Sequence, residues 1–239
     1  MPKAVIIGAT SGIGRDLAIE LHERGYSVGL TGRREKRLKS ITTELGENAF
    51  FIPMDVTNFE ASREQLQDLI KQLGGMDLIV LNAGIGNMKQ KLEWQQEQLT
   101  IDVNVRGFVN LALDSYSFFE RQGSGQIVGI SSISALFGYG LAPAYTASKA
   151  FISNYMQGLR QKAHRSEGDI TITDIRPGFV ETEMTEDNNK MFWVASSPDA
   201  SRQIANAIEA GKSRAYITGR WNIIAALIKL TPNWLLDRL

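Results

Sequence analysis

The 239-residue sequence contains no cysteine and only two histidines. The absence of cysteine excludes disulfide bonds, thiolate nucleophiles and cysteine-ligated zinc. The histidines, His22 and His164, lie far apart among charged residues, so we interpret them as surface side chains and predict no metal site. Lysine plus arginine and aspartate plus glutamate balance at 26 each, which leaves no overall charge to attract nucleic acid or an acidic membrane.

Long hydrophobic runs are also missing. The longest late apolar run, Ile223 to Ile228, is far shorter than the ~20 residues that a membrane-spanning helix needs. The first residues, Met1 to Lys3, lead directly into a strand-like apolar run and do not show the pattern of a signal peptide. We therefore expect a cytoplasmic protein that has no membrane span and binds no nucleic acid.

Short apolar runs alternate with longer amphipathic stretches up to about residue 218. The alternation of strands with helices such as Gly14–Arg24, Glu60–Leu73 and Ala147–Ala163 predicts an α/β fold, with a doubly wound parallel sheet and helices on both faces. We expect one domain over residues 1–239 that ends in a helical tail from about residue 220. The predicted strands are Ala4–Ile7, Ser27–Thr31, Ala49–Ile52, Leu78–Leu81, Gln126–Ile130, Ile170–Ile175 and Ala215–Thr218.

A glycine-rich turn joins the first predicted strand to the first helix. Glycines in such a turn let the backbone bend tightly, approach a pyrophosphate and pack the helix on the strand. The helix N-terminus adds unpaired N–H groups and the positive end of its dipole. The turn therefore predicts a dinucleotide site formed by Gly8, Thr10, Ser11, Gly12, Ile13 and Gly14.

The second predicted strand ends in Thr31-Gly32-Arg33-Arg34. An NAD-selective site usually has an acidic residue here, which binds the ribose 2′-hydroxyl. The acid is missing, and a guanidinium can instead bind two oxygens of a 2′-phosphate. We predict Arg33, with Arg34 as a second ligand, at the 2′-phosphate of NADP, whereas a solvated basic helix start is the alternative. The missing acid also argues against a methyltransferase.

Two further strand ends carry candidate coenzyme residues. Asp55, followed by Val56, is placed to accept a hydrogen bond from an adenine amino group, although helix N-capping explains it equally well. The fourth strand runs into Asn82, Ala83 and Gly84, where small residues allow close approach of a coenzyme and the asparagine side chain can link neighbouring strands.

The segment that ends in Tyr145-x-x-x-Lys149 predicts the chemistry. On a helix these two side chains share a face, and a fixed ammonium lowers the pKa of a nearby phenol, so that it can act as a general acid/base. Ser132 lies thirteen positions before Tyr145 and could hydrogen-bond a substrate oxygen, with Ser131 as the competing serine. A lone motif of this kind also occurs by chance on many helices, so the assignment depends on the other motifs.

Taken together, these motifs resemble the short-chain dehydrogenase/reductase family. The resemblance extends over roughly residues 3–218 and implies a Rossmann-type sheet of seven parallel strands with a nicotinamide coenzyme across their carboxyl ends. Its motifs are GATSGIG (8–14), Asp55-Val56, Asn82-Ala83-Gly84, Asn104-Val105-x-Gly107, Ser132, Tyr145-x-x-x-Lys149, Arg176-Pro177-Gly178 and Val180-x-Thr182.

The resemblance also implies roles for single residues. Tyr145 would be the general acid/base, Lys149 would hold the nicotinamide ribose, and Ser132 would orient the carbonyl oxygen. Asn104 would hold a water that connects Lys149 to solvent. The nicotinamide end would contact Pro177, Gly178, Val180 and Thr182.

The implied function is an NADP(H)-dependent oxidoreductase that interconverts a ketone or aldehyde and an alcohol. The alternatives are a catalytically silent nucleotide-binding sensor or scaffold and an NAD-linked alcohol dehydrogenase. We expect the substrate to meet Ile85–Lys91, Leu136–Leu141 and a lid-like segment, Glu183–Pro198, with EDNNK at its centre. Apolar surface there would come from Phe137, Tyr139, Met184, Met191, Phe192 and Trp193, which favours an uncharged, moderately hydrophobic substrate.

The C-terminal stretch departs from the family pattern, in which a strand commonly leads into an Asp-Gly-Gly-like turn. It predicts two short amphipathic helices separated by Pro232. This tail could cover the substrate mouth, pair subunits or touch a membrane surface, and we expect a homodimer through the helices of Asn104 and Tyr145, with a tetramer as the alternative. The candidate buried residues of the tail are Trp221, Leu227, Leu230, Trp234 and Leu235.

Overall fold

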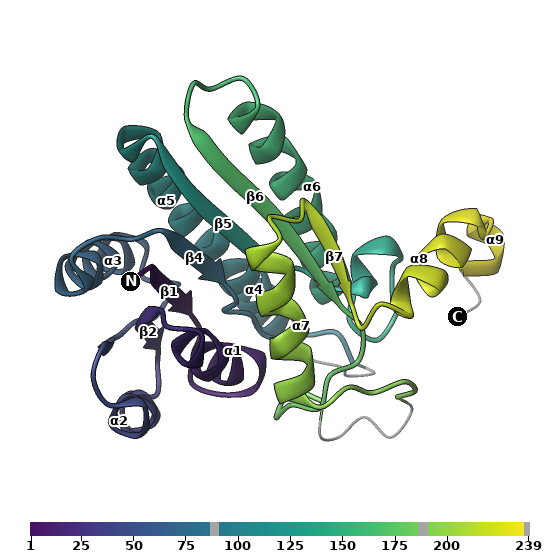
Figure 1. Ribbon diagram of the computed structural model, residues 1–239. Helices are drawn as coiled ribbons and strands as arrows, with labels where there is room; N and C mark the ends of the chain where they lie inside the picture. The colour runs from purple at the N-terminus through teal and green to yellow at the C-terminus, as the bar shows by residue number, and fades with distance from the viewer. Residues whose placement is uncertain (87–90, 186–190, 237–239) are drawn as a thin grey trace.

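A seven-stranded, fully parallel sheet forms the centre of the computed structural model, which describes residues 1–86, 91–185 and 191–236 (Figure 1). The strands lie in the order β3-β2-β1-β4-β5-β6-β7, and every neighbouring pair is parallel. This confirms the predicted fold class, and β6 extends two residues beyond its predicted end. The strands are β1 Lys3–Ile7, β2 Ser27–Gly32, β3 Ala49–Pro53, β4 Leu78–Leu81, β5 Ser124–Ile130, β6 Asp169–Pro177 and β7 Arg214–Ile217.

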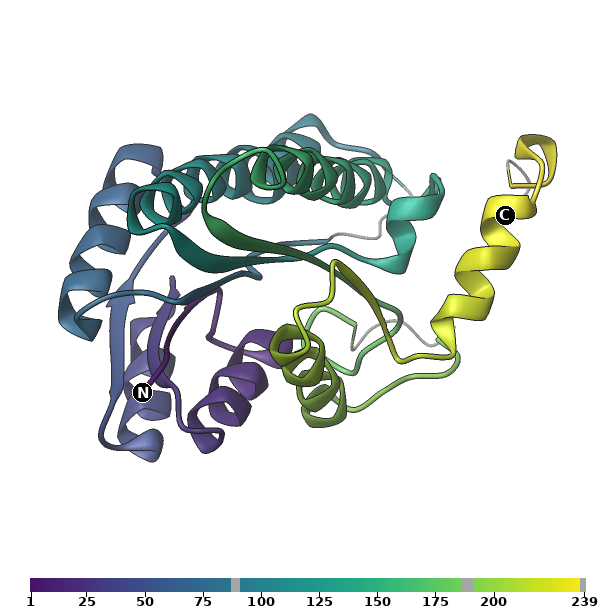
Figure 2. The same ribbon diagram turned by 45° about the horizontal axis from the view of Figure 1, so that its top comes forward.

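Helices cover both faces of the sheet, and each face has its own apolar core (Figures 1 and 2). One core joins the sheet to α1 (Gly12–Glu23), α2 (Glu35–Leu45) and α7 (Ser197–Glu209). The other joins it to α3 (Phe59–Leu73), α5 (Phe108–Gln122) and α6 (Pro143–Ala163). The central strands are buried on both sides, which explains why their sequences are continuously apolar.

Helix α3 illustrates how local sequence sets an element. Asn58 caps its first turn by accepting a hydrogen bond from the Ala61 N–H at 3.4 Å. Gly74 ends the helix in the left-handed conformation, at φ 71°, which glycine adopts without steric cost. Between these ends, Leu66, Leu69, Ile70 and Leu73 recur at helical spacing and are buried.

The helix of Asn104, between β4 and β5, is interrupted. It consists of α4 (Trp94–Ile101), a π-helical turn η1 (Asp102–Gly107) and α5. Asn104 lies in this wider turn and is completely buried. Single π-helical turns inside α-helices occur frequently at functional sites. The π-helical turn at Asn104 therefore indicates a functional site nearby.

The sheet changes winding direction between β1 and β4. The chain proceeds from β1 outward to β3 on one side and from β4 outward to β7 on the other. Ligands of open α/β sheets bind at the carboxyl ends of the strands at such a switch point. The glycine turn after β1 and the Asn82 segment after β4 both lie at this position.

The C-terminal tail forms the two predicted helices, α8 (Trp221–Leu230) and α9 (Asn233–Leu236), and projects away from the body of the molecule (Figure 2). Trp221 is buried as predicted, but the other candidates are exposed. Helix α8 packs near β7 and η2 (Ile133–Leu136) through one face, formed by Trp221, Ile224, Ala225 and Ile228, and Leu227 and Leu230 lie off that face. The incorrectly predicted core residues, with their exposed fractions, are Leu227 (56%), Leu230 (82%), Trp234 (62%) and Leu235 (44%). In the described ranges no helix is both long and apolar enough to cross a membrane.

Candidate active site

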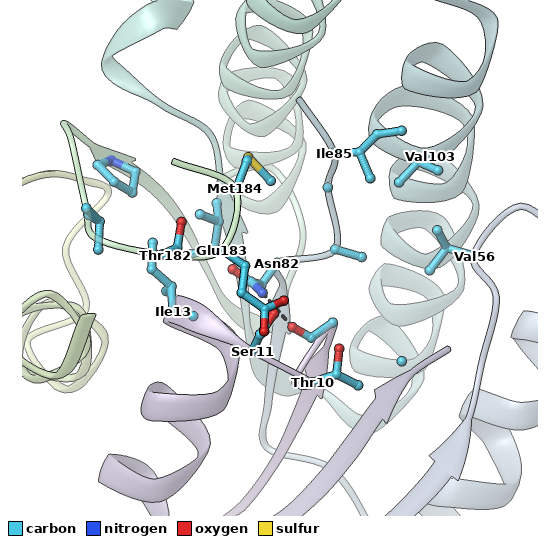
Figure 3. A pocket seen from close by; sticks show the side chains of 18 of the residues that line it. Thr10, Ser11, Ile13, Val56, Asn82, Ile85, Val103, Thr182, Glu183 and Met184 are labelled. Atoms are coloured by element: carbon cyan, nitrogen blue, oxygen red, sulfur yellow. Dashed lines mark hydrogen bonds between the residues drawn. The ribbon is translucent and has the colours of Figure 1, made fainter. Parts of the chain in front are cut away.

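A cleft of about 270 Å³ opens at the carboxyl ends of the strands, over the switch point (Figure 3). It brings together every coenzyme and catalytic residue that the sequence predicts, except Gly14 and Asn104. The predicted residues that line it are Gly8, Thr10, Ser11, Gly12, Ile13, Arg33, Arg34, Asp55, Val56, Asn82, Ala83, Gly84, Ser132, Tyr145, Lys149, Pro177, Gly178, Val180 and Thr182.

The glycine turn needs its glycines for packing and for backbone conformation. Gly8 has φ +89°, and a Cβ on it would lie 2.7 Å from the Ala83 Cα. A Cβ on Gly14 would lie 2.1 Å from the Gly8 carbonyl oxygen, so this glycine lets α1 pack on the end of β1 and does not face the cleft. Asn82 Nδ2 donates to the Gly8 carbonyl oxygen at 2.8 Å, which links β4 to β1 as predicted. The open turn at the start of α1 fits a pyrophosphate.

The two arginines after β2 both line the cleft, in different surroundings. Arg34 donates to Thr10 Oγ1 at 2.8 Å and to Ser11 Oγ at 2.6 Å, which ties α2 to the glycine turn. Arg33 lies near Asp55. Burial acts to raise the pKa of Asp55, but hydrogen bonds from Thr57 and the charge of Arg33 outweigh burial and lower it.

The N-capping interpretation of Asp55 is wrong, because Asn58 caps α3. Asp55 Oδ1 instead accepts from the backbone N–H of Thr57 at 3.0 Å and from its hydroxyl at 2.7 Å. These bonds hold the carboxylate at the rim of the cleft, beside Arg33.

Tyr145 and Lys149 lie one turn apart on α6, and Lys149 Nζ is 5.7 Å from the centre of the Tyr145 ring. Ser132, just after β5, reaches the Tyr145 phenol with its hydroxyl and also accepts from the Ser134 N–H at 3.1 Å. The competing Ser131 directs its hydroxyl to Asp174 Oδ1, at 2.5 Å. The serine next to the phenol is therefore Ser132.

The pKa of Tyr145 shifts in the direction opposite to the prediction. Burial raises the pKa of Tyr145, and the hydroxyls of Ser132 and Ser134 only partly oppose the increase. Burial lowers the pKa of Lys149 from 10.5 to about 8, against the opposing charge of Asp174. The predicted lowering of the tyrosine pKa is therefore not found, because the loss of water around the phenol outweighs the hydrogen bonds from the two serines.

A buried polar network behind the cleft was not predicted. Asp174, on β6, is completely buried and accepts hydrogen bonds from Ser131, from Ser153 at 2.9 Å and from Arg176 at 2.8 Å. Lys149 Nζ donates to the Ile130 carbonyl oxygen at 2.9 Å, immediately before Ser131. Asp174 thus fixes Ser131 at the end of β5. The neighbouring residues there are Ser132 and Ile130, whose carbonyl oxygen binds Lys149. An aspartate and an arginine, at positions 174 and 176 near the end of a strand, were the available sequence signal.

Asn104 connects three parts of the site. Its Oδ1 accepts from the Ile85 N–H at 2.8 Å, while its Nδ2 donates to the Ile85 carbonyl oxygen at 2.8 Å and to Ser148 Oγ at 2.9 Å. The side chain therefore fixes the segment after β4 against α6, directly beside Lys149.

The predicted substrate side is only partly described, because 87–90 and the centre of the predicted lid, 186–190, lie outside the described residues. Among the described residues, Ile85 and Met184 line the cleft, whereas Phe137 and Tyr139 do not. Phe192 and Trp193 instead pack on Trp221, with ring centres 5.2 and 6.1 Å away.

Trp221 also connects the tail to the cleft. A Cβ on Gly178 would lie 2.0 Å from the Trp221 ring, so the first residue of α8 directly supports a residue that lines the cleft. The structure therefore relates the tail to the predicted nicotinamide segment, which the sequence did not indicate.

Comparison with known proteins identifies the family. A model described as short chain dehydrogenase matches residues 2–193. The chain belongs to the short-chain dehydrogenase family. An uncharacterized oxidoreductase from Myxococcus xanthus (strain DK1622) is 34% identical over 241 residues, which covers 98% of this chain and 94% of the relative.

Solved structures of similar fold carry either coenzyme. The closed form of serine dehydrogenase complexed with NADP+ has a TM-score of 0.77 at 25% identity, over 86% of this chain and 88% of that chain. The 3-ketoacyl-(acyl-carrier-protein) reductase from Brucella melitensis complexed with NADH has a TM-score of 0.83 at 21% identity, over 91% and 97%. The second likeness shows the fold alone. This short-chain dehydrogenase is an oxidoreductase, and the described part of the chain contains no cluster of metal-ligating side chains.

Proposed function

We propose that this short-chain dehydrogenase is an NADP(H)-dependent oxidoreductase that interconverts a ketone or aldehyde and an alcohol. The observation that carries the proposal is the convergence of Ser132, Tyr145 and Lys149 in the same cleft as the glycine turn. The bound coenzyme supplies or accepts the hydride. The chain's own residues position the substrate and move the proton.

In this proposal the Tyr145 hydroxyl gives its proton to the substrate oxygen during reduction and takes it back during oxidation. Its raised pKa keeps the phenol protonated at neutral pH, which suits the reductive direction. Ser132 donates a hydrogen bond to the same oxygen and so stabilises the charge that develops on it.

Lys149 and Asn104 complete the site. The Lys149 pKa of about 8 leaves it mostly charged at neutral pH, where it can hold ribose hydroxyls and replace the proton lost by the tyrosine. Asn104 holds the backbone at Ile85 and the start of α6 in register. Its role in a water relay stays a prediction.

Replacement of Tyr145 by phenylalanine tests the chemistry. We expect Tyr145→Phe to lose about 10²–10⁴ in kcat with a panel of carbonyl compounds, while NADPH binding by fluorescence titration stays within about twofold. Unchanged turnover would refute the assignment. A wild-type protein that binds NADPH but reduces no member of the panel would favour the silent sensor.

The preference for NADP(H) rests on Arg33 and Arg34 and on the missing acid after β2. The solved relatives include both NADP+ and NADH complexes, so the preference must come from this chain's own residues. We expect Arg33→Ala to weaken NADPH binding about tenfold and to leave NADH binding nearly unchanged. Equal losses for both coenzymes would favour the NAD-linked alcohol dehydrogenase.

We also propose that the chain is a single domain that forms a homodimer through the helices of Asn104 and Tyr145. Leu113 on α5 and Phe151 on α6 are exposed apolar side chains that support this choice. A monomeric mass by light scattering would refute it.

A further inference from the structure

Glu183 connects the basic start of α2 to the far wall of the cleft. Its carboxylate accepts a hydrogen bond from Arg34 Nη1 at 2.7 Å and another from Arg37. Arg34 simultaneously donates to Thr10 and Ser11 of the glycine turn. In Figure 3 the Glu183 side chain extends across the cleft toward Ser11. The carboxylate therefore binds Arg34, one of the two arginines that the sequence predicts at the 2′-phosphate of NADP.

A short turn presents this carboxylate. The Thr185 N–H donates to the Thr182 carbonyl oxygen at 2.9 Å, and Thr185 Oγ1 both accepts from the Thr182 N–H and donates to the Val180 carbonyl oxygen. Glu183 lies at the corner of that turn. The Thr182 methyl group would be 2.9 Å from a Cβ on Gly12, so the turn lies directly on the phosphate-binding backbone.

A carboxylate and a phosphate offer the same recognition to a guanidinium, namely two oxygens in one plane. Both cannot bind Arg34 and Arg37 in the same position. Hydrogen bonds from these arginines lower the pKa of Glu183 to about 2, so the carboxylate stays charged at neutral pH. The three side chains are 41–47% exposed, and exposed ion pairs contribute little to stability, so a phosphate can displace the carboxylate without disrupting the fold.

We propose that Glu183 competes with the 2′-phosphate of NADP(H) for Arg34 and Arg37, and thereby sets how strongly the protein prefers NADP(H) over NAD(H). This inference rests on the proposed function. NAD(H) has no phosphate at this position and leaves the Glu183 contacts in place. Glu183 is thus a specificity-determining residue on the opposite side of the cleft from the β2 end, where an acid usually performs this role.

The same turn reaches the reaction centre. Met184 Sδ is 3.4 Å from the position of a Cβ on Gly86, and the Tyr145 ring is 3.0 Å from that position. The turn that carries Glu183 therefore lies close to Tyr145 through Met184.

Two fragments that differ only in the 2′-phosphate, 2′,5′-ADP and 5′-AMP, test the proposal by calorimetry with the full chain. The variant is Glu183→Gln. Its matched control is Glu181→Gln, which removes the same charge from an exposed side chain two residues earlier. We expect Glu183→Gln to bind 2′,5′-ADP about three- to tenfold more tightly than the wild type, because the arginines no longer have a competing carboxylate. Binding of 5′-AMP by this variant, and of both fragments by the control, should change less than twofold.

Unchanged or weaker 2′,5′-ADP binding by Glu183→Gln would overturn the inference. Equal tightening of both fragments, or equal tightening by the control, would also overturn it, since the effect would then be general charge repulsion. NADPH binding by the wild type, measured in parallel, separates this inference from the proposed function. If the wild type does not bind NADPH, the NADP(H) assignment itself is wrong. If it binds NADPH but Glu183→Gln has no effect on 2′,5′-ADP binding, only the competition by Glu183 is wrong.

Discussion

Replacing Lys149 by methionine should change how the stability of the protein depends on pH. Lys149 is buried, and burial lowers its pKa from 10.5 to about 8. Between these two values the unfolded chain binds a proton that the folded chain lacks, so the free energy of unfolding rises with pH. Below about pH 8 both states are protonated, and the folded state carries the full cost of the buried charge. From pH 7 to pH 10 the wild type should therefore gain about 2 kcal/mol from this residue.

Urea denaturation of the wild type and Lys149→Met at pH 7, 8, 9 and 10 measures this gain. The difference in the free energy of unfolding between the two proteins should increase by about 2 kcal/mol in favour of the wild type over this range. Tyr145 does not contribute below about pH 10, because its pKa is raised above the unfolded value of 10. Tyrosines elsewhere in the chain contribute equally to both proteins. A difference that stays flat or falls with pH would refute the claim that burial dominates the Lys149 pKa.

Four further substitutions test the fold around the site. Asp174→Asn should lower the free energy of unfolding in urea by about 3 kcal/mol, because it leaves the buried Arg176 guanidinium without its carboxylate. Gly14→Ala should lower it by about 1–3 kcal/mol, because the new Cβ would meet the carbonyl of the turn at 2.1 Å, and an unchanged melting temperature would contradict this. Trp221→Ala should cost about 3–5 kcal/mol, whereas Leu230→Ala, on the exposed part of α8, should change stability by less than about 0.5 kcal/mol. Similar losses for the last two would mean that the tail packs elsewhere.

Local features of the sequence predict most of the fold. The apolar runs at β4 and β5 are buried on both faces, and this requirement is visible in their composition. Gly8 and Gly14 are needed by the backbone at their own positions, so the glycine turn is also visible in the sequence. The tail was predicted less well, because an amphipathic pattern at Leu227 and Leu230 shows that one face is apolar but does not show what covers it.

The sequence by itself determined the family, the parallel sheet and the glycine turn, and it predicted that Ser132, Tyr145 and Lys149 lie in one cleft, since these features depend on short-range patterns. Only the tertiary structure decided the direction of the Tyr145 and Lys149 pKa shifts, because desolvation depends on everything packed around a group. It also decided the Glu183 contacts with α2, which join residues almost 150 positions apart in the chain. Ion pairs of this kind leave no local pattern, since each partner alone resembles an ordinary surface charge.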